Sequence, residues 1–122
     1  EFSARVRELT GGQGVDLVFE HIGTPVWESC FASLRRRGRL VICGVTAGHW
    51  VKLHLGQLWS KELGVIGSTN YPEEDFNAIA RLVERGLVHG VVDSVFPLDK
   101  TAEAQKRMES GDFFGKIVLT VS

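Results

Sequence analysis

The chain has 122 residues, enough for one domain with a buried core, and its 43% hydrophobic and 24% charged residues are ordinary for a globular protein. A formal net charge of −1 argues against the basic face that nucleic-acid binding needs, so no nucleic-acid partner is expected. No apolar run reaches membrane-spanning length, no signal peptide opens the chain, and two cysteines make no disulfide framework, so we expect no membrane partner and a cytoplasmic location.

The first third of the chain alternates helices with short apolar strands. Residues 2–9 place apolar side chains at helical spacing, and residues 15–19 form a short apolar run that is typical of a buried strand. Thr24 is a good helix N-cap, and residues 27–34 then repeat the helical spacing. Three arginines at 35–37 follow, and we interpret them as cations that complement the dipole at the end of this helix.

The same unit then repeats along the chain. Residues 40–43 are predicted as a second buried strand, residues 55–59 as a short helix, and residues 63–66 as a third strand. Three apolar strands at near-regular spacing, separated by helices, indicate βαβ units and therefore the α/β class with a parallel sheet.

The last part of the chain differs in kind. Asn70 and Glu73 have the spacing of a capping box, which predicts the start of another helix. Beyond it we expect a strand at 91–96, a helix at 100–110 and a final strand at 116–121. The regular alternation thus gives way near residue 68 to a C-terminal strand-helix-strand segment.

Glycines mark the points where the three strands end. Ligands of open parallel sheets bind outside the carboxyl ends of the strands, where glycine lets a flat group approach the backbone. Main-chain groups there can bind a carboxamide such as the one on a nicotinamide ring. A single glycine of this kind is better explained by a tight turn, but three in succession favour a ligand site. The segments selected are His21-Ile22-Gly23-Thr24, Cys43-Gly44-Val45 and Gly67-Ser68-Thr69.

Other chemical signatures are weak. The glycine-rich residues 11–14 precede a strand instead of following one, so they form a turn and not a phosphate loop. Cys43 is a candidate reactive thiol near a cofactor, although buried structural thiols are commoner. Glu20 beside His21 is the most suggestive polar pair, with a solvent-facing or supporting role favoured. The four histidines show no metal-ligand spacing: His21, His49, His54 and His89.

Several spaced segments resemble one family. They are ELTGGQGVD at 8–16 running into LVFE, GRLVICG at 38–44, GVIGS at 64–68 and GKIVL at 115–119. Together these segments resemble the medium-chain dehydrogenase/reductase superfamily, which includes zinc alcohol dehydrogenases and quinone oxidoreductases. The likeness runs through essentially the whole chain in order.

The resemblance implies the C-terminal portion of a two-domain enzyme that uses NAD(P)H. Residues 1–68 would be the second half of a Rossmann-type parallel sheet, and residues 69–122 a return segment toward the catalytic domain, forming one compact unit with the first part. Zinc would belong to the absent N-terminal domain, with none bound by this chain and no catalytic residue in it. The residues implied to line the cofactor are His21, Gly23, Cys43, Gly44, Val45, Gly67, Ser68 and Lys116.

Two functions remain open at this point. The leading one is a fragment of an NAD(P)H-dependent oxidoreductase, inactive alone, whose complete form transfers hydride to or from an alcohol, aldehyde, quinone or enone. The alternative is a cofactor-free assembly module, because the strands at 15–19 and 63–66 would leave exposed sheet edges that favour self-association. Either way a homo-oligomer formed through a sheet edge is expected.

Overall fold

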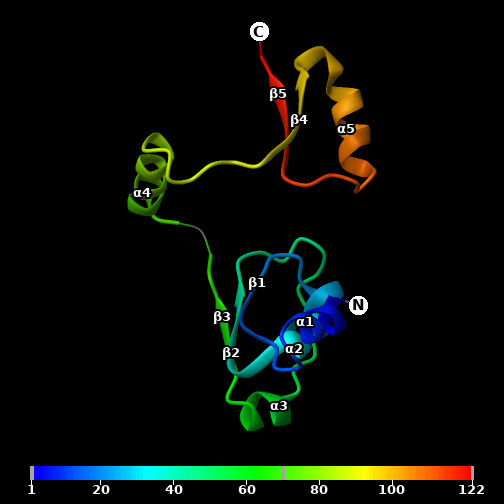
Figure 1. Ribbon diagram of the computed structural model, residues 1–122, viewed down its shortest axis with the longest axis vertical. Helices are drawn as coiled ribbons and strands as arrows, with labels where there is room; N and C mark the ends of the chain where they lie inside the picture. The colour runs from blue at the N-terminus through cyan, green and yellow to red at the C-terminus, as the bar shows by residue number, and fades with distance from the viewer. Residues whose placement is uncertain (1, 70, 122) are drawn as a thin grey trace. The chain divides into compact units, whose positions relative to one another are not determined.

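The computed structural model describes residues 2–69 and 71–121, and these two ranges belong to two separate compact units (Figure 1). A division near residue 68, and the association of both parts into one body, stay predictions.

The first unit holds a three-stranded parallel sheet with the order β1-β2-β3, as the sequence predicted. Helices α1 and α2 pack against each other, and α2 also contacts β1 and β2. The elements of this unit are α1 (Phe2–Leu9), β1 (Val15–Glu20), the 3-10 turn η1 (Thr24–Val26), α2 (Trp27–Ser33), β2 (Leu34–Ile42), α3 (Leu55–Ser60) and β3 (Gly64–Gly67).

The core of this unit lies between α2 and β2. Leu34 and Leu40 are fully buried, and the rings of Trp27 and Phe31 stack with their centroids 5.8 Å apart. Burial of such large apolar side chains is the main stabilising contribution to a small unit of this kind.

The prediction that all three strands are buried is wrong for two of them. In β1, Val18 packs against the core, but Leu17 and Phe19 are 54% and 67% exposed. Successive side chains of a strand point to opposite faces, so β1 buries one face only. Two neighbouring residues of β3, Val65 and Ile66, are likewise exposed. The apolar runs identified the strands correctly but overstated how far they are covered within this chain.

The three arginines at 35–37 do not end a helix. Helix α2 ends at Ser33 and β2 begins at Leu34, so the arginines lie at the start of the strand. Their guanidinium groups form ion pairs instead: Arg35 with Asp16, and Arg36 and Arg37 with Glu62. The dipole interpretation is therefore wrong, because a strand start with two carboxylates beside it satisfies these cations.

The helix caps also differ from expectation. Gly23 precedes η1, and the Thr24 hydroxyl does not cap it but donates to the Trp50 carbonyl at 2.9 Å. An unpredicted cap occurs at α3, where His54 Nδ1 accepts a hydrogen bond from the Gln57 amide at 3.1 Å. Asn70, the predicted cap of the next helix, lies outside the described residues, and that helix begins only at Glu73.

The second unit contains an exposed helix and a βαβ motif. Strands β4 and β5 pair in parallel and are joined through α5, which confirms the predicted strand-helix-strand segment. Asp93 of β4 accepts two hydrogen bonds from the Arg107 guanidinium at 3.1 and 2.9 Å, and this contact lowers the pKa of Asp93 to about 2. The elements are α4 (Glu73–Glu84), β4 (Val92–Pro97), the 3-10 turn η2 (Leu98–Lys100), α5 (Thr101–Glu109) and β5 (Lys116–Thr120).

Candidate functional site: the carboxyl edge of the first sheet

The three strands of the first unit end side by side. Glu20 of β1 is level with Ile42 of β2, which is level with Gly67 of β3. The pairing continues beyond the strands, because the Cys43 amide donates to the Glu20 carbonyl at 2.8 Å and the Ser68 amide to the Ile42 carbonyl at 2.8 Å. The predicted meeting of the three strand ends is confirmed. We call this region the shelf, defined by His21–Gly23, Cys43–Val45 and Gly67–Ser68.

The loops that follow β1 and β2 are joined by main-chain hydrogen bonds. The amides of Thr46 and Ala47 donate to the carbonyls of His21 and Ile22 at 3.3 and 2.7 Å. The carbonyl groups of His21 and Ile22 thus already accept hydrogen bonds within the chain. The two loops therefore form one connected surface.

The three glycines of the shelf differ in what an added side chain would meet. Gly23 has a φ of 97°, and a Cβ there would lie 2.1 Å from the Gly48 carbonyl oxygen, so loop packing alone requires glycine. A Cβ on Gly44 would lie 3.1 Å from the His21 carbonyl oxygen, a tight but smaller conflict. A Cβ on Gly67 would meet no other atom within 4 Å, so open space lies beside the end of β3.

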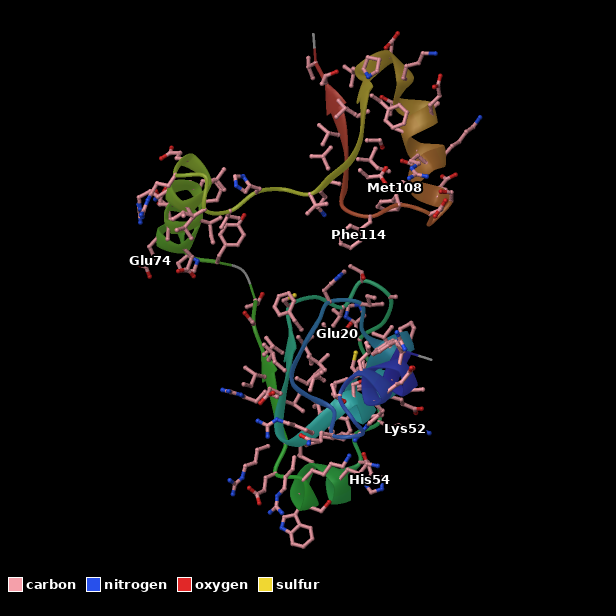
Figure 2. All side chains as sticks on the ribbon, in the orientation of Figure 1. Glu20, Lys52, His54, Glu74, Met108 and Phe114 are labelled. Carbon is pink, nitrogen blue, oxygen red and sulfur yellow. The ribbon has the colours of Figure 1, made fainter. Side chains whose placement is uncertain are left out.

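Glu20 is the best-buried charged residue of the site, with only 4% of its surface exposed. Its carboxylate Oε1 accepts hydrogen bonds from the amide of Ile22 and from the amide of Gly23, the latter at 2.7 Å. Figure 2 labels Glu20 at the end of β1 from which this loop leaves. The sequence indicated Glu20 only as one member of a polar pair with His21. The signal that could have identified its role is an acidic residue at the end of an otherwise hydrophobic strand.

The two cysteines differ in their surroundings. Cys30 is buried in the core, and burial raises the pKa of its thiol, with the negative charge of Glu20 adding to the effect. Cys43 is exposed on the shelf, and its Sγ lies 3.5 Å from the Glu20 carbonyl oxygen. The commoner interpretation of Cys43, a buried structural thiol, is therefore wrong.

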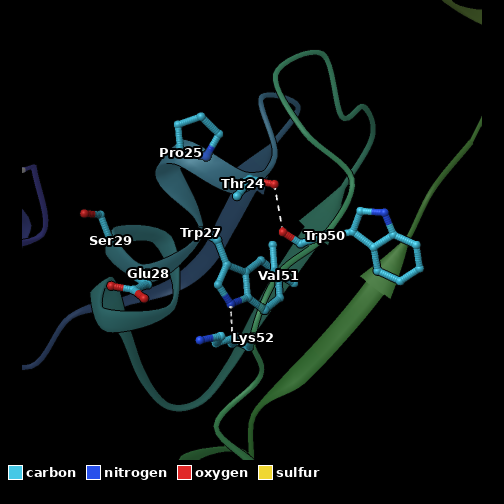
Figure 3. A pocket seen from close by; sticks show the side chains of 8 residues that line it. All are labelled: Thr24, Pro25, Trp27, Glu28, Ser29, Trp50, Val51 and Lys52. Carbon is cyan, nitrogen blue, oxygen red and sulfur yellow. Dashed lines mark hydrogen bonds between the residues drawn. The ribbon is translucent and has the colours of Figure 1, made fainter.

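A pocket of about 610 Å³ adjoins the shelf at Thr24 (Figure 3). It forms because residues 50–52 lie against α2, held by a hydrogen bond of 3.0 Å from Trp27 Nε1 to the Lys52 carbonyl. The sequence did not predict this pocket. Its remaining lining residues are Pro25, Glu28, Ser29, Trp50 and Val51.

The remaining expected features concern metal, the last site residue and the membrane. Within residues 2–69 and 71–121, no three His, Cys, Asp or Glu side chains are grouped closely enough to hold a metal ion. Lys116 is exposed at the start of β5, in the second unit, and its place beside the cofactor stays a prediction. In the same described ranges, none of the helices has the length and apolar character that crossing a membrane requires.

The sequence profile of a family described as zinc-binding dehydrogenase matches residues 1–119. Among curated relatives, the chain is 31% identical over 118 residues to a crotonyl-CoA reductase of Streptomyces collinus, covering 95% of this chain and 26% of that protein. It is 32% identical over 133 residues to a 2-haloacrylate reductase of Burkholderia sp, covering 98% of this chain and 39% of the relative.

Solved structures agree with these relatives. A thermostable alcohol dehydrogenase from Pyrobaculum aerophilum, with bound cobalt and zinc, superimposes with a TM-score of 0.81 at 30% identity, covering 95% of this chain and 35% of that one. A 2-octenoyl-CoA carboxylase reductase in complex with NADP and 2-octenoyl-CoA gives a TM-score of 0.77 at 32% identity, covering 97% of this chain and 26% of that one.

The chain belongs to the zinc-binding dehydrogenase family, within the medium-chain dehydrogenase/reductase superfamily of oxidoreductases. The resemblance seen in the sequence is thereby confirmed, and so is the Rossmann-type parallel fold. The chain spans about a quarter to two fifths of the length of the relatives described above.

Proposed function

We propose that the shelf holds the nicotinamide end of NAD(P)H in an oxidoreductase of which this chain forms part. The observation that carries the proposal is the side-by-side ending of β1, β2 and β3, with open space beside Gly67. Open parallel sheets bind their ligands at this edge. The relative whose structure holds NADP supports a nicotinamide cofactor over other flat ligands.

The residues of the shelf fit such a ligand by shape. The loops after β1 and β2 form a fixed surface because the amides of Thr46 and Ala47 donate to the carbonyls of His21 and Ile22. Gly67 leaves room for a ring beside the end of β3. When bound, the dihydronicotinamide supplies a hydride to the substrate. The chain's own part is to place that ring and to restrict its orientation, which is a requirement for a reacting geometry. We place Lys116 and Ser68 as further contacts to the cofactor, and assign no step to zinc.

For the substrate we propose an alkene conjugated to a carbonyl group. The names of several relatives denote reduction of such compounds: crotonyl-CoA, 2-haloacrylate and acryloyl-CoA. A quinone is also a conjugated carbonyl compound, and quinone oxidoreductases are among the relatives. Alcohols and aldehydes form the second candidate class, which the alcohol dehydrogenase relatives favour.

The proposal is tested in the complete protein that carries this chain, with a matched pair of variants. Gly67→Leu places a side chain in the open space of the shelf, whereas Gly90→Leu does so in the second unit at another glycine with nothing within 4 Å. We expect Gly67→Leu to raise the KM for NADPH or NADH by about tenfold or more, which corresponds to about 1.4 kcal/mol, and Gly90→Leu to leave it unchanged.

The same assay uses crotonyl-CoA and a quinone with NADPH or NADH as the hydride donor, and a primary alcohol with NADP⁺ or NAD⁺ as the hydride acceptor. Turnover of the first two supports the substrate class proposed. A wild-type protein that binds neither NADPH nor NADH in calorimetry would overturn the proposed function, and an equal KM in Gly67→Leu would remove the shelf from it.

We also propose that the protein is a homo-oligomer joined through a sheet edge. β1 and β3 are the outer strands of the sheet, and Val65 and Ile66 on β3 are exposed. Sedimentation of the protein as a monomer at high concentration would contradict this. The cofactor-free assembly module gains no support from the relatives, and a cytoplasmic location stays a prediction.

A further inference from the structure

Glu20 joins the end of β1 to the shelf through both its main chain and its side chain. Its carbonyl accepts the Cys43 amide, and its carboxylate accepts the amides of Ile22 and Gly23. The carboxylate folds back on the loop that directly follows it, so one residue fixes the turn after β1 and the pairing of that turn with β2.

The carboxylate of Glu20 is balanced by these amides. Within the described part of the chain, no Lys, Arg or His nitrogen forms an ion pair with it, in contrast to Asp16 and Glu62. Burying a carboxylate is costly unless it is hydrogen bonded, and amide donors to a charged acceptor form strong bonds. The loop after β1 is consequently held in the conformation in which both amides point toward the Glu20 carboxylate.

Hydrogen bonds connect the loop after β1 to the loop after β2. The carbonyls of His21 and Ile22 receive the amides of Thr46 and Ala47, so the loop after β2 is attached to the loop that Glu20 holds. The Gly48 carbonyl also receives the Thr24 amide at 3.4 Å. Two of the three segments of the shelf therefore depend on one buried carboxylate.

We propose that Glu20 is a positioning residue for the nicotinamide cofactor: it touches no ligand itself but sets the shape of the shelf. This inference rests on the proposed function. Without an acceptor at this position, the amides of Ile22 and Gly23 turn toward water, and the two loops lose their common conformation. Cofactor affinity then falls while the sheet itself, held by its own ladder, persists.

The test uses the complete protein with two substitutions at Glu20 and the same two at Glu8, an exposed glutamate paired with Arg5 on α1. Glu20→Met removes the acceptor, and Glu20→Gln retains an acceptor oxygen without the charge. Dissociation constants for NADPH and NADH are measured by fluorescence. Hydrogen exchange of the amides at Ile22, Gly23 and Ala47 is followed without cofactor, which gives a readout that does not depend on turnover.

We expect Glu20→Met to weaken cofactor binding by about tenfold and to speed exchange at the three amides, with Glu20→Gln recovering most of both losses. Glu8→Met and Glu8→Gln should change neither. Should Glu20→Met fail to fold, the residual loss in Glu20→Gln decides: a small acceleration of exchange confined to these loops supports the role, and acceleration spread over the whole sheet, or none at all, overturns it.

A merely structural role predicts a different result. Folded Glu20→Met would then bind cofactor as tightly as the wild type, or amide exchange would rise across the whole sheet instead of at the shelf. Either result overturns the inference and leaves the proposed function standing. Absence of cofactor binding by the wild type overturns both.

Discussion

The two ends of the first sheet are held together by different means. At the end where the strands begin, exposed ion pairs join neighbouring strands: Arg35 to Asp16 of β1, and Arg36 and Arg37 to Glu62 just before β3. At the end where the strands finish, main-chain hydrogen bonds and the buried Glu20 carboxylate join the loops.

This difference separates stability from ligand binding. Exposed ion pairs contribute little to stability and are screened by salt, so the starting end of the sheet tolerates change. At the end where the strands finish, polar groups of the loops form hydrogen bonds with one another. The residues His21, Cys43 and Val45 remain exposed there, on a surface of fixed shape. A ligand site requires such prior order, because ordering loops upon binding would reduce affinity.

The largest effect is expected at Gly23. Gly23→Ala forces an L-residue into a positive φ and places its Cβ against the Gly48 carbonyl, so we expect a loss of about 3 kcal/mol in the free energy of unfolding. Gly67→Ala, also at a strand end but in open space, is the control and should shift the free energy by less than about 1 kcal/mol. Urea unfolding measures the free energy of unfolding of both variants. Equal losses of stability in the two variants would show that loop packing does not distinguish Gly23 from Gly67.

The next effect compares the carboxylates of the two ends. Glu20→Met leaves two amide donors without their acceptor, which we expect to cost about 2 kcal/mol in the free energy of unfolding. Glu62→Met removes exposed ion pairs and should cost distinctly less. The reverse order in thermal or urea unfolding would contradict the division of roles between the two ends.

A third expectation concerns pH. The Arg36 and Arg37 guanidinium groups lower the pKa of Glu62 from 4.5 to about 2. Because the folded state has the lower pKa, Glu62 stabilises the fold at pH values above its unfolded pKa, and this stability is lost as the pH falls from about 4.5 toward 2. Unfolding curves of wild type and Glu62→Gln should therefore converge over this range. A gap of constant size down to the lowest pH would show that the ion pairs do not cause the difference.

The smallest effect is expected from salt. Arg35→Gln removes the ion pair with Asp16, both of whose side chains are exposed to solvent. The stability difference from wild type should shrink as NaCl rises to about 1 M, because screening weakens a surface pair. Glu20→Gln serves as the buried comparison and should keep its stability difference at high salt. If salt changed the stability difference from wild type equally in both variants, exposed and buried carboxylates would not differ in the way proposed.

The sequence predicted the elements and the parallel sheet because hydrophobic spacing and glycine stops are local signals. It also located the strand tips, since parallel strands that pair in register must end at one edge. It missed the use of Arg35, Arg36 and Arg37, because their partners lie 19 to 26 residues away in the chain. The fixing of the loop by Glu20 was missed for a related reason. Whether an acid at a strand end faces solvent or folds back onto the next amides depends on the loop conformation, which spacing does not reveal.

We propose that the nicotinamide cofactor binds at the end of the first sheet where β1, β2 and β3 finish. Hydrogen exchange of the complete protein with and without saturating NADPH or NADH tests it most directly. We predict added protection at residues 21–24, 43–47 and 67–69, and unchanged exchange at residues 35–38 and 61–63 at the opposite end. Protection confined to the opposite end, or none in the three tip segments while the cofactor is bound, would contradict the claim.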